Sequence, residues 1–80
     1  MTKSVFTRRY ALFLSILISL RKDKGFSQHL LAKKLKKPQS YVSKYERGER
    51  RLDVVEFLDI AKALGADEHE IIKKIAASPK

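Results

Sequence analysis

The sequence contains no cysteine and no tryptophan, and it has only three glycines and two prolines among its 80 residues. Without cysteine there can be no disulfide framework and no cysteine-ligated zinc site. Small secreted domains are usually stabilised by disulfides, so the absence of cysteine favours a cytoplasmic protein in a reducing environment. The two histidines, His29 and His69, are far apart in the sequence, and two histidines by themselves do not supply a metal site. We therefore expect no metal ion and no other cofactor.

Long apolar runs are also missing. A transmembrane helix needs about 20 apolar residues, and the run that follows Arg9 is roughly half as long. The basic residues Lys3, Arg8 and Arg9 precede this run, as they would in a signal peptide, but no small-residue cleavage site follows it, because it ends in the letters LRKD. The sequence therefore favours neither a membrane span nor a signal peptide, and no membrane partner is expected.

Acidic residues are few: nine Asp and Glu stand against 18 Lys and Arg, for a net charge of +9. Residues 33–51 carry eight basic and two acidic side chains, and residues 1–25 carry six and one, whereas residues 52–80 carry four and six. A basic region of this density is typical of a protein that binds a polyanion, either nucleic acid or an anionic membrane. A solvated surface would show the same charge run, so charge alone leaves both interpretations open.

Apolar residues recur at helical spacing in five stretches, and no strand-like alternation is present. Ser27, Asp53 and Asp67 are candidate N-caps of the second, fourth and fifth stretches, and each of the three glycines follows a stretch as a helix stop. Residues 1–7 are expected to be a loose or partly helical lead-in. The length fits one domain, residues 1–80. The sequence thus predicts a compact all-α domain of five helices.

Residues 27–48, SQHLLAKKLKKPQSYVSKYERG, contain the second and third of these helices. We expect Leu30, Leu31, Ala32 and Leu35 to hold the second helix against the third. Placed at about 100° per residue, Val42, Tyr45 and Glu46 fall on the inner side of the third helix. The polar side chains of the outer side can bond base edges or phosphate in a DNA groove. They are Gln39, Ser40, Ser43, Lys44 and Arg47.

These letters resemble the phage repressor/Cro (Xre-type) helix-turn-helix family of DNA-binding proteins. The resemblance covers roughly residues 18–72 and depends on SQxxLA, then PQSYVSKYERG, then FLDIAKALGAD. It implies a helix-turn-helix made by the second and third helices. It also implies that Arg21, near the end of the first helix, forms a structural ion pair with Glu46 at the end of the third.

The resemblance implies a role for each matching position. Gln28 would contact a DNA phosphate and brace the third helix, whose N-terminal residues would read bases. Tyr41 would touch the DNA backbone. The turn before the third helix contributes Lys37 as a further candidate, whereas glycine is usual at the neighbouring position, here Lys36. The complete set of candidate DNA-binding residues is Gln28, Lys37, Gln39, Ser40, Tyr41, Ser43, Lys44, Arg47, Arg50 and Arg51.

The expected function is that of a sequence-specific double-stranded DNA-binding transcriptional regulator. Family members usually bind palindromic operators as homodimers, with the third helix in the major groove. The candidate dimer faces are apolar positions of the first helix (Leu14, Ile18) or of the fifth (Ile71, Ile72, Ile75). Two alternatives stay open, an antitoxin-type protein-interaction module that also binds DNA and a non-specific nucleoid binder. No nucleophile constellation, glycine-rich phosphate loop or paired carboxylates indicate an enzyme.

Overall fold

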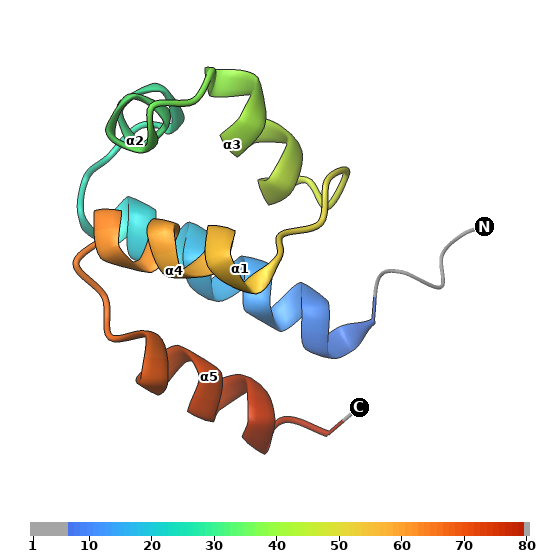
Figure 1. Cartoon of the computed structure of the whole chain (residues 1–80). Helices are drawn as coiled ribbons and strands as arrows, with labels where there is room; N and C mark the ends of the chain where they lie inside the picture. The colour runs from blue at the N-terminus through green and yellow to red at the C-terminus, as the bar shows by residue number, and fades with distance from the viewer. Residues whose placement is uncertain (1–6, 80) are drawn as a thin grey trace.

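The computed structural model describes residues 7–79, and these residues form five α-helices and no strand (Figure 1). The all-α fold expected from the sequence is confirmed. Apart from Thr7, the expected lead-in lies outside the described residues. No helix within residues 7–79 is long and apolar enough to cross a membrane. The helices are α1 (Arg8–Asp23), α2 (Gln28–Leu35), α3 (Gln39–Glu46), α4 (Val54–Ala63) and α5 (Glu68–Ala77).

The backbone N–H groups in the first turn of a helix have no partner within the helix. In four of the five helices, the side chain of the residue before the helix accepts a hydrogen bond from one of these groups. Ser27 accepts from the N–H of Leu30 at 3.0 Å. Asp53 and Asp67 begin α4 and α5 in the same way. These three predicted helix starts are confirmed. Helix α3 differs, because Pro38 precedes it and supplies no side-chain cap.

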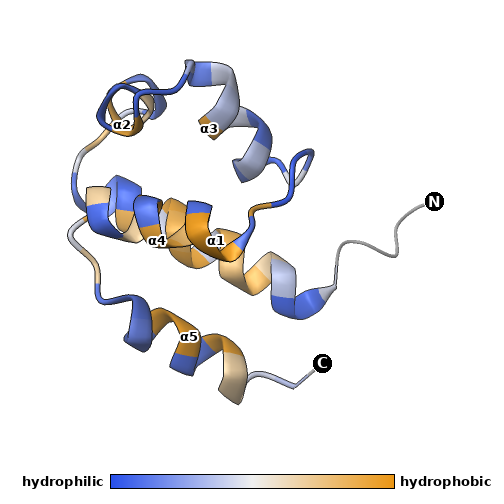
Figure 2. Ribbon diagram, viewed as in Figure 1, coloured by the Kyte–Doolittle hydropathy of each residue, from blue (hydrophilic) through white to orange (hydrophobic). Residues whose placement is uncertain are grey.

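The core lies where α1, α2, α3 and α4 converge. Helix α2 packs against both α3 and α4, while α1 contacts α3 and α5. In Figure 2 the apolar residues are concentrated in α1, α4 and α5, whereas α3 and the loop that follows it are mostly polar. The helix-turn-helix pair is therefore held on an apolar base. The largest fully buried side chains are Tyr45, Leu17, Leu31, Ile60, Leu64 and Val42.

Three apolar residues differ from their predicted roles. Leu14 and Ile71, expected in a dimer face, are only 3% and 4% exposed because both belong to the core of this chain. Neither is therefore available to a second copy. Leu30, expected to hold α2 against α3, is 38% exposed. One residue is about 100° of helical rotation, so the complete burial of Leu31 turns its neighbour Leu30 toward solvent.

Candidate nucleic-acid interface

The turn between α2 and α3 is set by Lys36. Its backbone is left-handed, with φ 59° and ψ 43°, and it is the single non-glycine residue with positive φ in residues 7–79. This conformation lets the N–H of Lys37 donate to the carbonyl of Ala32 at 2.9 Å, which closes the end of α2. Pro38 then continues in extended backbone into α3. The turn thus has the shape for which the family uses glycine, with a lysine in its place.

Helix α3 is anchored by its inner side and open on its outer side. Val42 and Tyr45 have no solvent exposure. Gln39, Ser40 and Lys44 are exposed, whereas Tyr41 and Ser43 are half-buried. Ser40 and Lys44 are four residues apart, so they lie on the same face of the helix. The result is a helix anchored by its buried inner side, with a short polar strip directed away from the core.

A hydrogen-bonded network ties this helix to α1 and α2. Arg21, itself buried, places Nε 2.7 Å from Oε2 of Glu46 and Nη2 3.1 Å from Oε1, which is the paired, fork-like geometry of a strong ion pair. Its third nitrogen, Nη1, donates to the carbonyl of Phe26 at 2.8 Å. The hydrogen bonds that Arg21 donates to Glu46 raise the pKa of Arg21, although burial opposes the charge. Removing either partner would leave a poorly solvated charge unpaired.

The same network reaches the outer surface through two glutamines. Nε2 of Gln28 donates to Oε1 of Glu46 at 2.9 Å. The side-chain oxygen of Gln28 accepts a long hydrogen bond of 3.5 Å from Nε2 of Gln39. The first residue of α2 therefore braces the first residue of α3, and a buried ion pair orients both. The predicted site residues Gln28 and Gln39 are brought together here.

A second group of candidate residues is stacked between the turn, α3 and the loop after it. The ammonium of Lys37 lies 5.3 Å from the centre of the Tyr41 ring, and the guanidinium of Arg50 lies 5.0 Å from it. Cations at this distance are attracted by the face of an aromatic ring. Burial raises the pKa of the Tyr41 hydroxyl, with a further contribution from Glu56, so this group is a hydrogen-bond donor at neutral pH.

Each of two candidate arginines is already paired with a carboxylate. Arg47 donates from Nε and Nη2 to the two oxygens of Glu49, both at 3.0 Å, and from Nη1 to Oγ of Ser43. Arg50 donates from Nη1 and Nη2 to Glu56 at 3.1 and 2.7 Å. Both arginines stay more than two-fifths exposed. Neither Glu49 nor Glu56 was expected from the sequence to take part in this site.

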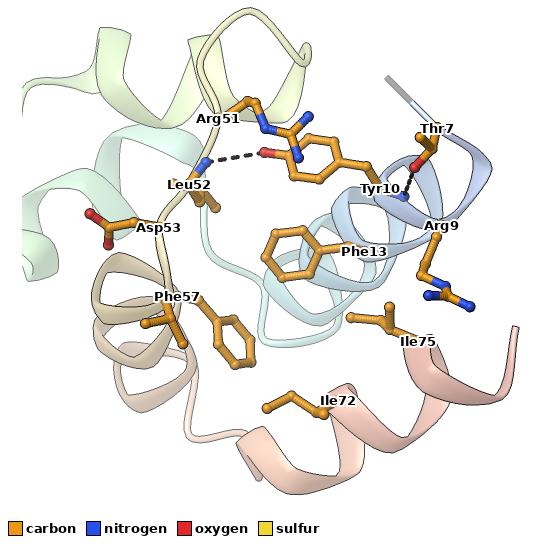
Figure 3. A pocket seen from close by; sticks show the side chains of 11 residues that line it. Thr7, Arg9, Tyr10, Phe13, Arg51, Leu52, Asp53, Phe57, Ile72 and Ile75 are labelled. Carbon is orange, nitrogen blue, oxygen red and sulfur yellow. Dashed lines mark hydrogen bonds between the residues drawn. The ribbon is translucent and has the colours of Figure 1, made fainter. Parts of the chain in front are cut away.

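The side chain of Arg51 lies over α1, whereas those of Lys37 and Arg50 lie over the Tyr41 ring. Its guanidinium is 4.2 Å from the centre of the Tyr10 ring, and the Tyr10 hydroxyl accepts a hydrogen bond from the N–H of Leu52 at 3.1 Å (Figure 3). Tyr10 thus fixes the loop between α3 and α4. In the sequence, this role of Tyr10 is indicated by nothing more than an aromatic residue near the start of α1. Below it lies an apolar pocket of about 370 Å³, lined by residues of α1, of the loop between α3 and α4, of α4 and of α5.

Comparison with known proteins identifies the fold of this arrangement. The sequence profile of the helix-turn-helix family matches residues 17–71. An XRE-family like protein from Pseudomonas syringae pv. tomato str. DC3000 is 43% identical over 89% of this chain and 88% of that chain, with a TM-score of 0.83. The chain belongs to the XRE-type helix-turn-helix family. The matched stretch contains every candidate residue described above, and the resemblance seen in the sequence is confirmed.

Two further structures extend the XRE-type likeness. The restriction-modification controller protein C.AhdI from Aeromonas hydrophila is 37% identical, over 78% of this chain and 94% of that chain, with a TM-score of 0.70. The controller protein C.Esp1396I, solved as a tetramer in complex with its natural 35 base-pair operator, shares the fold at 22% identity and a TM-score of 0.78, over 89% and 93% of the two chains. None of the curated proteins compared with this chain matches it.

Proposed function

We propose that this chain is a sequence-specific double-stranded DNA-binding transcriptional regulator whose α3 enters the major groove. The observation that carries the proposal is the way in which packing and hydrogen bonds anchor α3. Its inner side is fully buried, and the network from Arg21 through Glu46 and Gln28 orients Gln39 at its exposed end. A helix held in this way can present amide and ammonium groups to base edges with little ordering cost.

Cations on both sides of α3 support the proposal. Lys37 precedes the helix, whereas Arg47 and Arg50 follow it, and all three are exposed. DNA phosphates bind such side chains without regard to sequence, and this supplies much of the affinity and its salt dependence. The names of the similar proteins agree with this role, because C.AhdI is a restriction-modification controller.

The test is selection of duplexes from random DNA by the purified protein at two salt concentrations. We expect an enriched motif at both concentrations, with symmetry if the protein binds as a dimer. Enrichment of no motif, with equal affinity for all duplexes, would favour a non-specific nucleoid binder. Failure to bind any duplex would reject the proposal and leave the protein-interaction module.

Single substitutions then separate base contacts from phosphate contacts. Gln39→Ala or Lys44→Ala is expected to cost about 1–3 kcal/mol on the selected duplex and little on a random one, because each removes a base contact. Arg50→Ala is expected to weaken both complexes about equally, because phosphate contacts carry no sequence information. Fluorescence anisotropy titrations measure both. A loss confined to the selected duplex for Arg50→Ala would contradict its phosphate role.

We further propose that the protein acts as a homodimer joined through the outer faces of α4 and α5. Val54, Val55 and Leu58 are 65%, 62% and 43% exposed on α4, and Ile72 of α5 is 47% exposed. Val54 of α4 and Ile72 of α5 both line the apolar pocket of about 370 Å³, so the two helices meet there; Ile72 is labelled in Figure 3. We call these four residues the α4–α5 patch. A palindromic operator has two-fold symmetry and would be bound by two copies of the chain, so we propose that a second copy covers this patch.

A further inference from the structure

The loop between α3 and α4 holds two guanidiniums that would meet DNA, and each faces a carboxylate of its own chain. Arg47 uses its Nε and Nη2 edge for Glu49, and Arg50 uses its Nη1 and Nη2 edge for Glu56. These are the edges that offer two parallel N–H groups to a planar or tetrahedral oxyanion. A DNA phosphate and these carboxylates are therefore ligands for the same part of each arginine.

We infer that Glu49 and Glu56 are built-in competitors of DNA phosphate that set the absolute affinity and the salt dependence of DNA binding without altering sequence preference. This inference rests on the proposed function. A phosphate that reaches either arginine must displace the carboxylate or lie beside it. In both cases the arginine–phosphate contact contributes less favourable free energy to DNA binding. Because phosphates are the same in every sequence, the reduction applies to selected and random DNA alike.

The two carboxylates differ in how firmly they are held. Glu49 is 55% exposed, and within residues 7–79 the hydrogen bonds to its carboxylate come from Arg47. Glu56 is 20% exposed and also belongs to the capping box of α4, where it accepts from the N–H of Asp53 at 2.9 Å. We therefore expect Glu49 to swing aside when phosphate arrives and Glu56 to stay, so that its charge continues to repel the DNA backbone.

The ionisation of both groups agrees with this role. The hydrogen bonds from Arg47 hold the pKa of Glu49 below its ordinary value. Those from Arg50, with the N–H of Asp53, lower the pKa of Glu56. Both side chains are consequently negative at neutral pH, where DNA binding would be measured.

The test compares Glu49→Gln and Glu56→Gln with Glu70→Gln as a matched control. The control changes the net charge by the same amount on α5, at the opposite end of the molecule from α3 (Figure 1), where Glu70 pairs with Lys73 at 3.6 Å. Glutamine keeps the capping-box hydrogen bond because its amide oxygen can accept from Asp53. Glu49→Gln, in an exposed loop outside any helix, carries no comparable risk to folding.

Affinities for a selected and a random duplex are measured by anisotropy across a salt series. We expect Glu49→Gln to tighten both complexes about two- to fivefold, because it removes a surface ion pair with Arg47. We expect Glu56→Gln to tighten them about three- to tenfold, because it removes a negative charge close to the DNA backbone. The slope of log affinity against log salt should steepen by about one for each arginine released. Glu70→Gln should change the slope little.

The inference is overturned if both glutamine variants match Glu70→Gln in affinity and slope while wild type binds DNA normally. It is also overturned if the gain is confined to the selected duplex, because that pattern would make the carboxylates part of sequence recognition. If wild type binds neither duplex, the proposed function fails with it. The wild-type titration therefore separates the two failures before any variant is compared.

Discussion

At the scale of single residues, Tyr45 combines two opposed properties. It is the largest of the fully buried side chains, and it forms an edge-on contact with the Tyr41 ring at 5.7 Å between centres. Yet its hydroxyl oxygen is buried without a hydrogen-bond partner among the described residues. Burial raises the pKa of Tyr45, so the group stays protonated. The ring contributes to the core, whereas the unpaired hydroxyl reduces that contribution.

Replacing this hydroxyl should stabilise the fold. Tyr45→Phe keeps the ring and removes a desolvated polar group, so the free energy of unfolding is expected to rise by about 1 kcal/mol. Thermal unfolding followed by circular dichroism at fixed protein concentration would show a melting temperature about 4–8 °C higher. Tyr41→Phe is the control and should change little, because Tyr41 is only half-buried. A lower melting temperature for Tyr45→Phe would mean that the hydroxyl has a partner in solution.

At the scale of elements, the helix-turn-helix contains a strained residue at its bend. Lys36 has a left-handed backbone that crowds its Cβ atom, at a cost of roughly 1 kcal/mol, whereas glycine adopts the same angles freely. The fold accepts this cost because the bend lets α2 end and α3 begin within three residues. The buried residues of both helices, Leu31 and Val42 among them, then meet in one core.

Lys36→Gly is accordingly expected to stabilise the protein by about 0.5–1 kcal/mol, part of the relief being offset by the greater freedom of glycine in the unfolded chain. Urea denaturation would measure the change. Lys33→Gly is the matched control, since Lys33 is also an exposed lysine of this segment but lies within α2. There glycine should destabilise by about 1 kcal/mol. Destabilisation by both substitutions would contradict strain at Lys36.

At the scale of the whole molecule, polar and apolar surface are separated. The α2–α3 side carries the candidate DNA-binding residues, whereas the α4–α5 patch exposes four large apolar side chains. In Figure 1, α3 and α5 lie on opposite sides of the layer formed by α1 and α4. Contiguous apolar surface on a small protein commonly marks a contact with another chain.

The proposed dimer can be tested by mass. Sedimentation equilibrium at tens of micromolar is expected to give a dimer for wild type and a monomer for Leu58→Lys, because a buried charge would oppose association across the α4–α5 patch. Leu30→Lys is the control: Leu30 of α2 is exposed to a similar extent, 38% against 43% for Leu58, but lies outside the patch. A monomeric wild type would reject the dimer, and dissociation by Leu30→Lys would place the interface elsewhere.

Much of this organisation could be predicted from local sequence. Helix boundaries depend on a few adjacent residues, so Ser27, Asp53 and Asp67 could be assigned as N-caps without knowing what the helices pack against. The helical period likewise assigned Val42 and Tyr45 to the inner side of α3. The family resemblance covered the same stretch, because a helix-turn-helix is a short contiguous motif.

Only the tertiary structure decided which side chains meet across the chain. The period of a helix indicates which residues share a face, but it does not say whether that face is covered, and so Leu14 and Ile71 are core whereas Leu58 and Ile72 are exposed. The bracing of Gln39 by Gln28 and the unpaired hydroxyl of Tyr45 depend on how helices approach one another. The partners of Arg47 and Arg50 are near in sequence, but the conformation of the loop between α3 and α4 decides that they pair. Sequence determined the helices and the type of motif because those interactions are local. The charges that DNA would meet were decided by the folded conformation of the loop between α3 and α4, because a carboxylate neutralises a cation only when the fold places the two within hydrogen-bonding distance.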